Sequence, residues 1–394
     1  MRGDSSYARY KNVPHYEQQF PEVIYEWNQL NYVFPDDQAL QAALNDQSFI
    51  PGSGIPVDVQ PYHNEKGDVK VFVSTPRFGM GIPYTLSTIA NNSSIEAYPS
   101  YEWHNRGEIA DNWDCDKITS TFRTAITECE QLWVLDSGMA ADEFKCPPQL
   151  LLFDLRNDQL VHRFRFNASH FTASASLFVT NVVQVNDPPP IGNCQNAMVY
   201  VADTDHHGLL VYDYAKNEAW RIENKFMYPD PDYGTHTLAG QSFTLMDGII
   251  GLSFDDQYLY FHPMAGITEY AVPLDIINNS TLFAGNKEAA ADEFKSIGKR
   301  SSPCVPSAID SKGIWYCVTF NPIELIAWNI KKKDLQKLPI KREHLEFVGG
   351  LKVIKNKENK EELWMLSNRF QRLATGTVNG NEVNYRIVRR RLDR

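Results

Sequence analysis

Two residues near the C-terminus of the chain have the side chains needed to bind an aromatic amine. A protonated ammonium requires oxygen acceptors, and a flat aromatic ring requires an apolar or aromatic wall. The segment LWMLSNRF offers both, in the amide of Asn368 and the ring of Phe370. The carboxylates of Asp136 and Asp203 are further candidates to pair with such a cation. The alternatives are that Phe370 packs without a ligand and that each aspartate is an ordinary turn former.

These residues follow strands of a unit that recurs along the chain. An apolar–aromatic–apolar triplet occurs six times, at Val71-Phe72-Val73, Leu132-Trp133-Val134, Val199-Tyr200-Val201, Leu259-Tyr260-Phe261, Ile314-Trp315-Tyr316 and Leu363-Trp364-Met365. Five of the six are followed by a second apolar run of strand length, such as QLLLFDL or GLLVYDY. A strand pair of this kind cannot bury both of its faces alone. The six copies therefore predict an all-β fold, a six-bladed β-propeller.

The two ends of the chain are expected to close this propeller. Segments 20–34 and 383–388 read as strands outside the six copies. Propellers remove their exposed edge by pairing strands from both termini within one blade. We therefore predict a closing blade made of both ends, a single propeller domain over residues 20–390, and an N-terminal extension over residues 1–19.

Polar residues directly after the triplets are candidates for a binding site. Ligands of propellers usually bind at the mouth of the central tunnel, where the inner strands and their loops converge. If the triplets lie on the inner strands, the residues at that mouth are Thr75, Asp136, Asp203, His262, Pro263, Thr319, Ser367 and Asn368.

Composition excludes several classes of protein. The chain has 394 residues, 43% of them hydrophobic and 22% charged, so it can form a core and is not disordered as a whole. Its net charge of −11 disfavours nucleic acid and anionic membranes as main partners. Its apolar runs fall short of the roughly 20 residues that span a bilayer.

Cysteines and glycosylation sequons favour a secreted protein. The six cysteines are even in number and lack the spacing of a zinc finger. Asn-X-Ser/Thr sequons occur in polar contexts at Asn91, Asn92, Asn167, Asn278 and Asn279. The first residues, MRGDSSYARYKN, lack the apolar core of a signal peptide. We expect a mature, secreted, disulfide-bonded form, the alternative being a cytosolic protein with buried thiols.

Several segments in chain order identify a family resemblance. They are YEWNQLNYVF, STPRFGMGIPYTL, CDKITSTFRTAITECEQLWVLDSG, CPPQLLLFDL, VYVADT, GLLVYDY, DGIIGLSFD, LWMLSNRF and NYRIV. In this order they resemble the insect yellow and major royal jelly protein family over nearly the whole chain. The resemblance implies a secreted six-bladed propeller whose axial channel, in several members, holds a small molecule. Members include pigmentation factors, dopachrome-converting enzymes, royal jelly nutrients and salivary proteins that capture biogenic amines.

The resemblance also implies a disulfide. In family members one bridge joins the positions that match Cys129 and Cys194. For the remaining cysteines we predict the pairs Cys115–Cys146 and Cys304–Cys317.

The match to the amine-binding salivary members is partial. Asn368 and Phe370 resemble the Asn and Phe that line their amine pocket. Arg369 stands where those proteins have Gly, and Gly349 appears where they have Thr, which disfavours an amine. Asp203 stands where they have Asn and adds a possible counter-ion.

Three functions follow as hypotheses. The first is a secreted protein that binds a small aromatic amine or catechol-derived ligand in its central channel. The second is a dopachrome-converting tautomerase of melanin formation, with Asp203 as the base and His262 or Arg77 handling the anionic oxygen. The third is a structural or storage protein without a ligand. No cofactor is expected, and no metal, because Asp136, Asp203 and Asn368 lack the Glu that would complete a calcium set like that of lactonase propellers.

Overall fold

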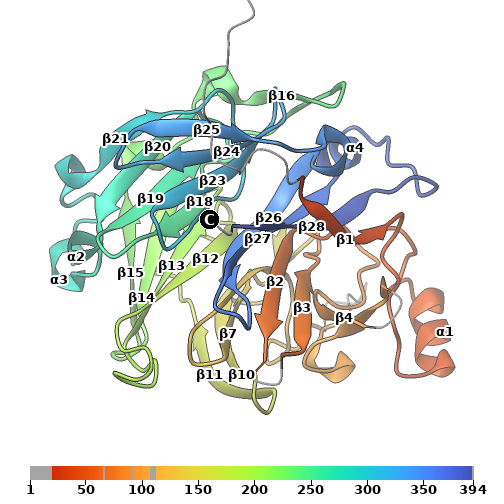
Figure 1. Cartoon of the computed structure of the whole chain (residues 1–394). Coiled ribbons are helices and arrows are strands. Elements are labelled where there is room, and N and C mark those ends of the chain that lie inside the picture. Colours follow the sequence, from red (N-terminus) through yellow and green to blue (C-terminus); the bar gives the residue numbers. More distant parts are fainter. Residues whose placement is uncertain (1–19, 65–66, 91–92, 107–111, 393–394) are drawn as a thin grey trace, which may run out of the picture.

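The chain folds into six four-stranded antiparallel sheets arranged as the blades of a propeller (Figure 1). The computed structural model describes residues 20–64, 67–90, 93–106 and 112–392. The innermost strands pack against one another in a closed ring, β2 on β6 and so on through β12, β18, β22 and β26 back to β2. The predicted all-β, six-bladed fold is confirmed, whereas the predicted extension over residues 1–19 lies outside the described residues.

The first three blades run in chain order from the channel outward. Their strands are β2 (Asp58–His63), β3 (Val69–Ser74), β4 (Leu86–Ile89) and β5 (Ile95–Ala97); β6 (Thr121–Ile126), β7 (Gln131–Asp136), β10 (Gln149–Asp154) and β11 (Gln159–Arg165); and β12 (Phe178–Val185), β13 (Ala197–Asp203), β14 (Gly208–Asp213) and β15 (Glu218–Glu223).

The last blade is built from both ends of the chain, as predicted. The remaining strands are β18 (Ile249–Phe254), β19 (Tyr258–Pro263), β20 (Thr268–Pro273) and β21 (Lys295–Lys299); β22 (Ala308–Ile309), β23 (Ile314–Thr319), β24 (Glu324–Asn329) and β25 (Asp334–Leu338); and β26 (Phe347–Lys355), β27 (Glu361–Asn368), β28 (Tyr385–Arg391) and β1 (Glu22–Trp27). In the closing blade β1 pairs antiparallel with β28 and forms the outer edge.

Short helices and two extra hairpins connect the blades. They are α1 (Asp37–Asn45), α2 (Leu274–Ile277), α3 (Ser280–Phe283) and α4 (Phe370–Ala374), five 3-10 turns (Tyr101–Trp103, Lys225–Met227, Pro231–Tyr233, Ala291–Glu293 and Arg342–His344), and the hairpins β8 (Met139–Ala140) with β9 (Glu143–Phe144) and β16 (Thr235–Leu238) with β17 (Gln241–Thr244). Within the described part of the chain, no helix is long and apolar enough to cross a membrane.

The aromatic triplets lie on the second strand of each blade and not on the innermost strand, contrary to our expectation. Strand β7 shows why, because all of its residues are buried. A second strand has neighbours on both sides and packs against adjacent blades, so it requires large apolar side chains. An innermost strand borders the channel and includes polar residues, as in the TFRTAI sequence of β6. The residues that follow the triplets therefore lie one strand away from the channel wall.

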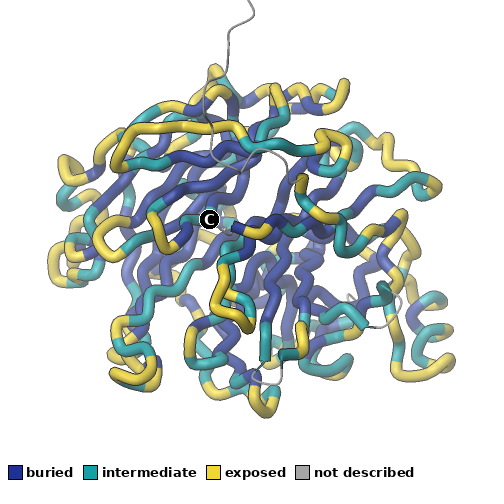
Figure 2. The backbone as a smooth tube through the Cα atoms, viewed as in Figure 1, coloured by how far each residue is buried: buried dark blue, intermediate teal, exposed yellow. Residues whose placement is uncertain are grey.

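Buried apolar side chains fill the spaces between neighbouring blades. Between the second and third blades, for example, Trp133 and Leu152 belong to the same cluster as Val199 and Tyr212. Figure 2 shows buried residues along the strands inside the blades and exposed residues at the turns. Each such side chain contributes about 1.5–3 kcal/mol on burial.

The three predicted disulfides are present. Their Cα–Cα distances are 5.4 Å for Cys115–Cys146, 6.1 Å for Cys129–Cys194 and 6.4 Å for Cys304–Cys317. Cys129 precedes β7 and Cys194 precedes β13, so this bridge joins the second blade to the third.

Candidate ligand-binding site in the axial channel

Four innermost strands contain a β-bulge near the end at which they begin. The register shifts lie between Thr121 and Thr124 in β6, Phe178 and Thr180 in β12, Ile249 and Gly251 in β18, and Val348 and Gly350 in β26. A bulge inserts an extra residue, re-aims the neighbouring side chains and leaves backbone groups unpaired. The four bulges lie near the same end of their strands, and the channel wall changes there from apolar to polar residues.

One end of the channel is closed by an apolar cluster, which we call the apolar plug. Its members include Phe122, Val179, Ile250, Phe320, Phe347 and the half-buried Phe370. Phe243, from the β16–β17 hairpin, belongs to the same cluster and lies 6.2 Å from Phe370 between ring centroids. The wall at this end is apolar and therefore favours contact with apolar groups over water.

Arg123 forms the boundary of the plug. Its Nη1 donates to the Thr180 hydroxyl and to the Ile250 carbonyl at 3.4 Å, and its Nη2 donates to the Gly349 carbonyl at 2.8 Å. Ile250 and Gly349 are the extra residues of the bulges in β18 and β26. One guanidinium therefore connects four blades across the channel. Burial lowers the pKa of Arg123 to about 10, so the group remains charged at neutral pH.

The other half of the channel is a cavity of about 1170 Å³. It opens among the turns between innermost and second strands, where Glu128 and Asp256 lie. Polar residues from all six blades lie along its wall, among them Asp58, Arg123, Asn181, Ser253, Ser307 and Lys352. We call these six residues the polar ring.

Several atoms of the polar ring have no hydrogen-bond partner among the residues that the structure describes. Both amide atoms of Asn181, which is completely buried, lack a hydrogen bond. The same is true of Asp58 Oδ1 and of the hydroxyls of Ser253 and Ser307. Buried polar groups in folded proteins nearly always have a partner, so these atoms are candidates to bind a ligand or water.

Asp58 and Lys352 form an ion pair in the polar ring. Lys352 Nζ lies 3.3 Å from Asp58 Oδ2 and donates to the Thr124 carbonyl at 2.6 Å. Asp58 Oδ2 also accepts from the Thr124 backbone N–H at 3.0 Å. Burial, with the nearby charge of Arg123, lowers the pKa of Lys352, and the charge of Asp58 opposes this shift. The pair is partly desolvated and faces the cavity.

The predicted amine-binding residues lie at the plugged end. Asn368 is buried, its Nδ2 donates to the Pro56 carbonyl at 2.8 Å, and its Oδ1 accepts from the Phe370 N–H at 3.0 Å. Arg369 forms ion pairs with Glu346 at 3.1 Å and Glu382 at 2.7 Å. Asn368 and Phe370 are thus together, but within the protein's own packing.

Asp136 is buried in a backbone-capping arrangement. Its carboxylate accepts from the backbone N–H groups of Thr119 at 2.9 Å, Ser120 at 2.7 Å and Gly138 at 3.0 Å. It also accepts from Gln149 Nε2 at 2.9 Å. These bonds hold the segment that enters β6, as expected of the turn-forming alternative.

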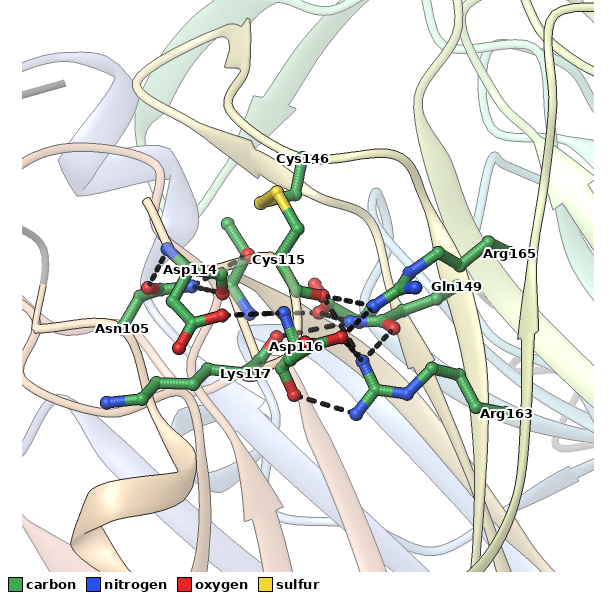
Figure 3. A network of polar contacts seen from close by, with 11 residues as sticks. Asn105, Asp114, Cys115, Asp116, Lys117, Cys146, Gln149, Arg163 and Arg165 are labelled. Carbon is green, nitrogen blue, oxygen red and sulfur yellow. Dashed lines mark hydrogen bonds and ion pairs between the residues drawn. A yellow bond between two sulfur atoms is a disulfide. The ribbon is translucent and has the colours of Figure 1, made fainter. Parts of the chain in front are cut away.

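Gln149 continues this network to the surface. Arg163 Nη1 donates to Gln149 Oε1 at 3.0 Å and to the carbonyl of Cys115 at 3.2 Å. Arg165 Nη2 donates to the same carbonyl at 2.9 Å, and Asp116 pairs with both arginines (Figure 3). The network fixes the loop that contains the Cys115–Cys146 bridge.

Asp203 has the same kind of environment in the third blade. Its carboxylate accepts from the Ser176 hydroxyl at 2.6 Å and the Leu177 N–H at 2.9 Å, and it pairs with Arg221 at 2.6 Å. The side chains of Asp203 and Arg221 are both fully buried. An ionised carboxylate with this many donors is well compensated and has no free face toward the channel.

His262 and Arg77 are buried away from the polar ring. His262 Nδ1 lies 2.9 Å from Glu269, which also pairs with Arg300 at 2.5 Å. Burial lowers the pKa of His262. Arg77 donates to the backbone carbonyls of Ile82, at 3.1 Å, and of Thr119.

The structure therefore brings Arg77 and Asp136 together at the backbone of Thr119, and Asn368 and Phe370 at the plug. Asp203 and His262 have separate partners. The polar ring was missed because its members lie on innermost strands, whose mixed sequences resemble surface strands. Their shared position, in the segment that precedes each triplet strand, is the signal that points to them. The described residues contain no group of three His, Cys, Asp or Glu side chains able to hold a metal ion.

Comparison with known proteins gives consistent similarities. A family model described as major royal jelly protein matches residues 119–394. The chain is 30% identical to the dopaminechrome tautomerase of Drosophila melanogaster, over 93% of this chain and 81% of that protein. It is 29% identical to major royal jelly protein 9 of Apis mellifera, over 93% and 86%. It is 28% identical to the protein yellow of Drosophila yakuba, over 92% and 67%.

Proposed function

Because the chain belongs to the major royal jelly protein family, we propose that it binds a catechol-derived aromatic compound in its axial channel and isomerises an aminochrome there. The cavity of about 1170 Å³ has room for a bicyclic ring system. Val182 and Val353, half-buried residues of its wall, supply apolar contact for a flat ring. The polar ring supplies hydrogen bonds for its substituents.

The observation that supports this proposal is the set of buried polar atoms without partners. A donor and an acceptor on Asn181, an acceptor on Asp58 and two hydroxyls belong to residues of one cavity wall. A catechol or quinone presents adjacent oxygens that can accept from or donate to such groups. Leaving them unpaired would cost roughly 1–3 kcal/mol each, which a ligand or water recovers.

The enzymatic part of the proposal comes from a relative. A protein 30% identical over 93% of this chain is named dopaminechrome tautomerase. Tautomerisation moves a proton from carbon to oxygen, so it requires a base, an acid and no cofactor. The polar ring contains both kinds of group in Asp58 and Lys352.

A second candidate is capture of an aromatic amine beside Asn368 and Phe370. The rings of Phe78, at 5.9 Å, and Phe347, at 5.1 Å, surround Phe370 and would form the apolar wall. A ligand there would have to displace part of the apolar plug. A structural or storage role without a ligand is the third candidate.

Binding and turnover measurements on matched variants distinguish these functions. Calorimetric titration would use a stable catechol, dopamine and serotonin, and turnover would be followed as loss of the visible absorbance of an aminochrome. We expect Asn181→Leu to weaken catechol binding about ten- to 100-fold, since it leaves ligand polar groups unpaired. Phe370→Ala should leave this binding unchanged. The reverse pattern would support the amine site, and absence of saturable binding and turnover would support the structural role.

We also propose that the protein is secreted and glycosylated. The three disulfides support an oxidising compartment. Asn167 and Asn279 are exposed, whereas Nδ2 of Asn278 donates to Gln184 at 3.3 Å and is engaged. Asn91 and Asn92 lie outside the described residues. Mass spectrometry of protein from insect cells should find glycans at Asn167 or Asn279 and none at Asn278.

A further inference from the structure

We propose that Asp58 and Lys352 are the proton-transfer pair of the channel, with Asp58 as the base and Lys352 as the acid. The inference rests on the proposed tautomerase function and assigns its catalytic residues. The two residues lie on β2 and β26, which are neighbours only because the ring of blades closes.

The geometry leaves one carboxylate oxygen of Asp58 without a hydrogen-bond partner among the described residues. Asp58 Oδ2 is used by the Thr124 N–H and by Lys352. Asp58 Oδ1 is buried, has no protein partner and belongs to a residue of the cavity wall. A general base must be oriented by its surroundings while keeping an unbonded oxygen for the incoming proton. Asp58 meets both requirements.

Lys352 is held in place to act on the oxygen side of the substrate. Its ammonium donates to the Thr124 carbonyl at 2.6 Å and lies 3.3 Å from Asp58, which leaves further N–H capacity toward the cavity. Arg123 is close enough to influence Lys352 electrostatically. Two cations beside one cavity stabilise the negative charge that develops on a quinone oxygen as the carbon loses its proton.

The reaction balances without any other reactant. Asp58 removes a proton from a ring carbon, and the C–H electron pair moves through the conjugated system to a quinone oxygen. Lys352 donates a proton to that oxygen, forming an O–H bond. The proton on Asp58 then passes to the neutral amine of Lys352 once the carboxyl group rotates and places its O–H toward Nζ, which lies 3.3 Å from the other carboxylate oxygen, and this restores both groups. Two such shifts convert an indoline quinone into a dihydroxyindole.

The groups packed against the pair have other roles. Thr124 contributes only backbone groups and a hydroxyl at 3.4 Å. The Arg123 guanidinium is occupied by the Thr180 hydroxyl and by carbonyls of β18 and β26, so we assign it a positioning role. Among the described members of the polar ring, Asp58 contains the carboxylate and Lys352 the amine, and the other four lack both groups.

The test compares turnover and binding in four variants of the full chain. We expect Asp58→Asn to lower kcat for an aminochrome about 10²–10⁴-fold, the usual contribution of a general base, with little change in catechol binding. Lys352→Cys should be inactive, and alkylation with 2-bromoethylamine should restore activity by rebuilding an ammonium. The alkylation is selective, because the six native cysteines form three disulfides. Lys337→Met and Glu324→Gln remove a surface ion pair of 2.7 Å and should retain wild-type kcat.

Each outcome decides one point. No acceleration by the wild-type protein would overturn the tautomerase function and this inference with it. Acceleration by the wild type together with a folded Asp58→Asn variant of unchanged kcat would overturn the inference alone. A folded, alkylated Lys352→Cys variant that binds catechol but remains inactive would overturn the role of Lys352. Loss of kcat in Asp58→Asn with recovery upon alkylation of Lys352→Cys would support the pair.

Discussion

Replacement of Arg123 by methionine should be among the most destabilising single changes in the channel. The guanidinium is almost fully buried and donates to the bulge carbonyls of Ile250 and Gly349. Methionine retains an apolar stem of similar length but has no donor. The Ile250 carbonyl keeps its hydrogen bond from the Thr180 hydroxyl at 2.6 Å, so the Gly349 carbonyl is the one that loses its donor. A buried carbonyl without a partner costs about 1–3 kcal/mol, and the neighbouring hydrogen bond to Thr180 is lost as well, while removal of the buried charge offsets part of the loss. We expect a net decrease of about 1–3 kcal/mol in the free energy of unfolding.

Urea denaturation of the disulfide-intact protein measures this quantity. Arg123→Lys should show an intermediate loss, because lysine keeps the charge but cannot bridge both carbonyls. Arg165→Met serves as the matched control, since Arg165 lies at the surface and its ion pair with Asp116 is exposed. Exposed pairs contribute about 0–1 kcal/mol. An Arg123→Met variant within about 1 kcal/mol of wild type would show that water replaces the guanidinium and that the bulges do not depend on it.

Three further changes test other parts of the structure. His104 is buried, and burial lowers its pKa to about 3, so the unfolded chain binds the proton more strongly than the folded chain. The free energy of unfolding should therefore fall as the pH decreases from about 6.5 toward 3, by up to about 1.4 kcal/mol per pH unit. The variant His104→Gln should flatten this pH profile, as measured by denaturation. Gly349→Thr should destabilise by about 1–3 kcal/mol, because a Cβ there meets the Val57 carbonyl at 2.9 Å; an unchanged urea midpoint would show that the backbone can shift. Removal of the Cys129–Cys194 bridge by a double Ser substitution should cost about 4 kcal/mol, as expected for a closed loop of 65 residues, and a thermal midpoint equal to that of the wild type would contradict this.

Much of the fold could be predicted from the sequence, because the second strand of each blade contains a recognisable apolar–aromatic–apolar triplet. Trp133, Tyr200 and Trp364 are buried on strands packed between blades, and large aromatic residues recur there for that reason. The closing blade could also be predicted, since both chain ends read as strands. The innermost strands could not be predicted, because β22 has only two residues and β6 mixes polar and apolar residues.

The candidate site could be predicted only in part, for a different physical reason. Asp58 and Lys352 are far apart in the chain and meet because the first and last blades adjoin. Nothing local in the sequence distinguishes either residue from a solvent-exposed strand residue. For Asp136, by contrast, the turn-forming alternative was visible in the Asp-Ser-Gly sequence, and the structure shows the corresponding bond to Gly138.

The bulges explain how one channel has both a closed and an open end. In β6 the shift of register covers Phe122 and Arg123, and these two adjacent residues take part in the plug and the polar ring respectively. A regular strand would place neighbouring side chains on opposite faces, so only one of them would face the channel. The bulge allows both, and Arg123 then satisfies carbonyls released by bulges in other blades. Different residues of the polar ring therefore serve stability and the proposed chemistry: Arg123 maintains the shape of the channel, while Asp58 and Lys352 carry out the proton transfer that we propose.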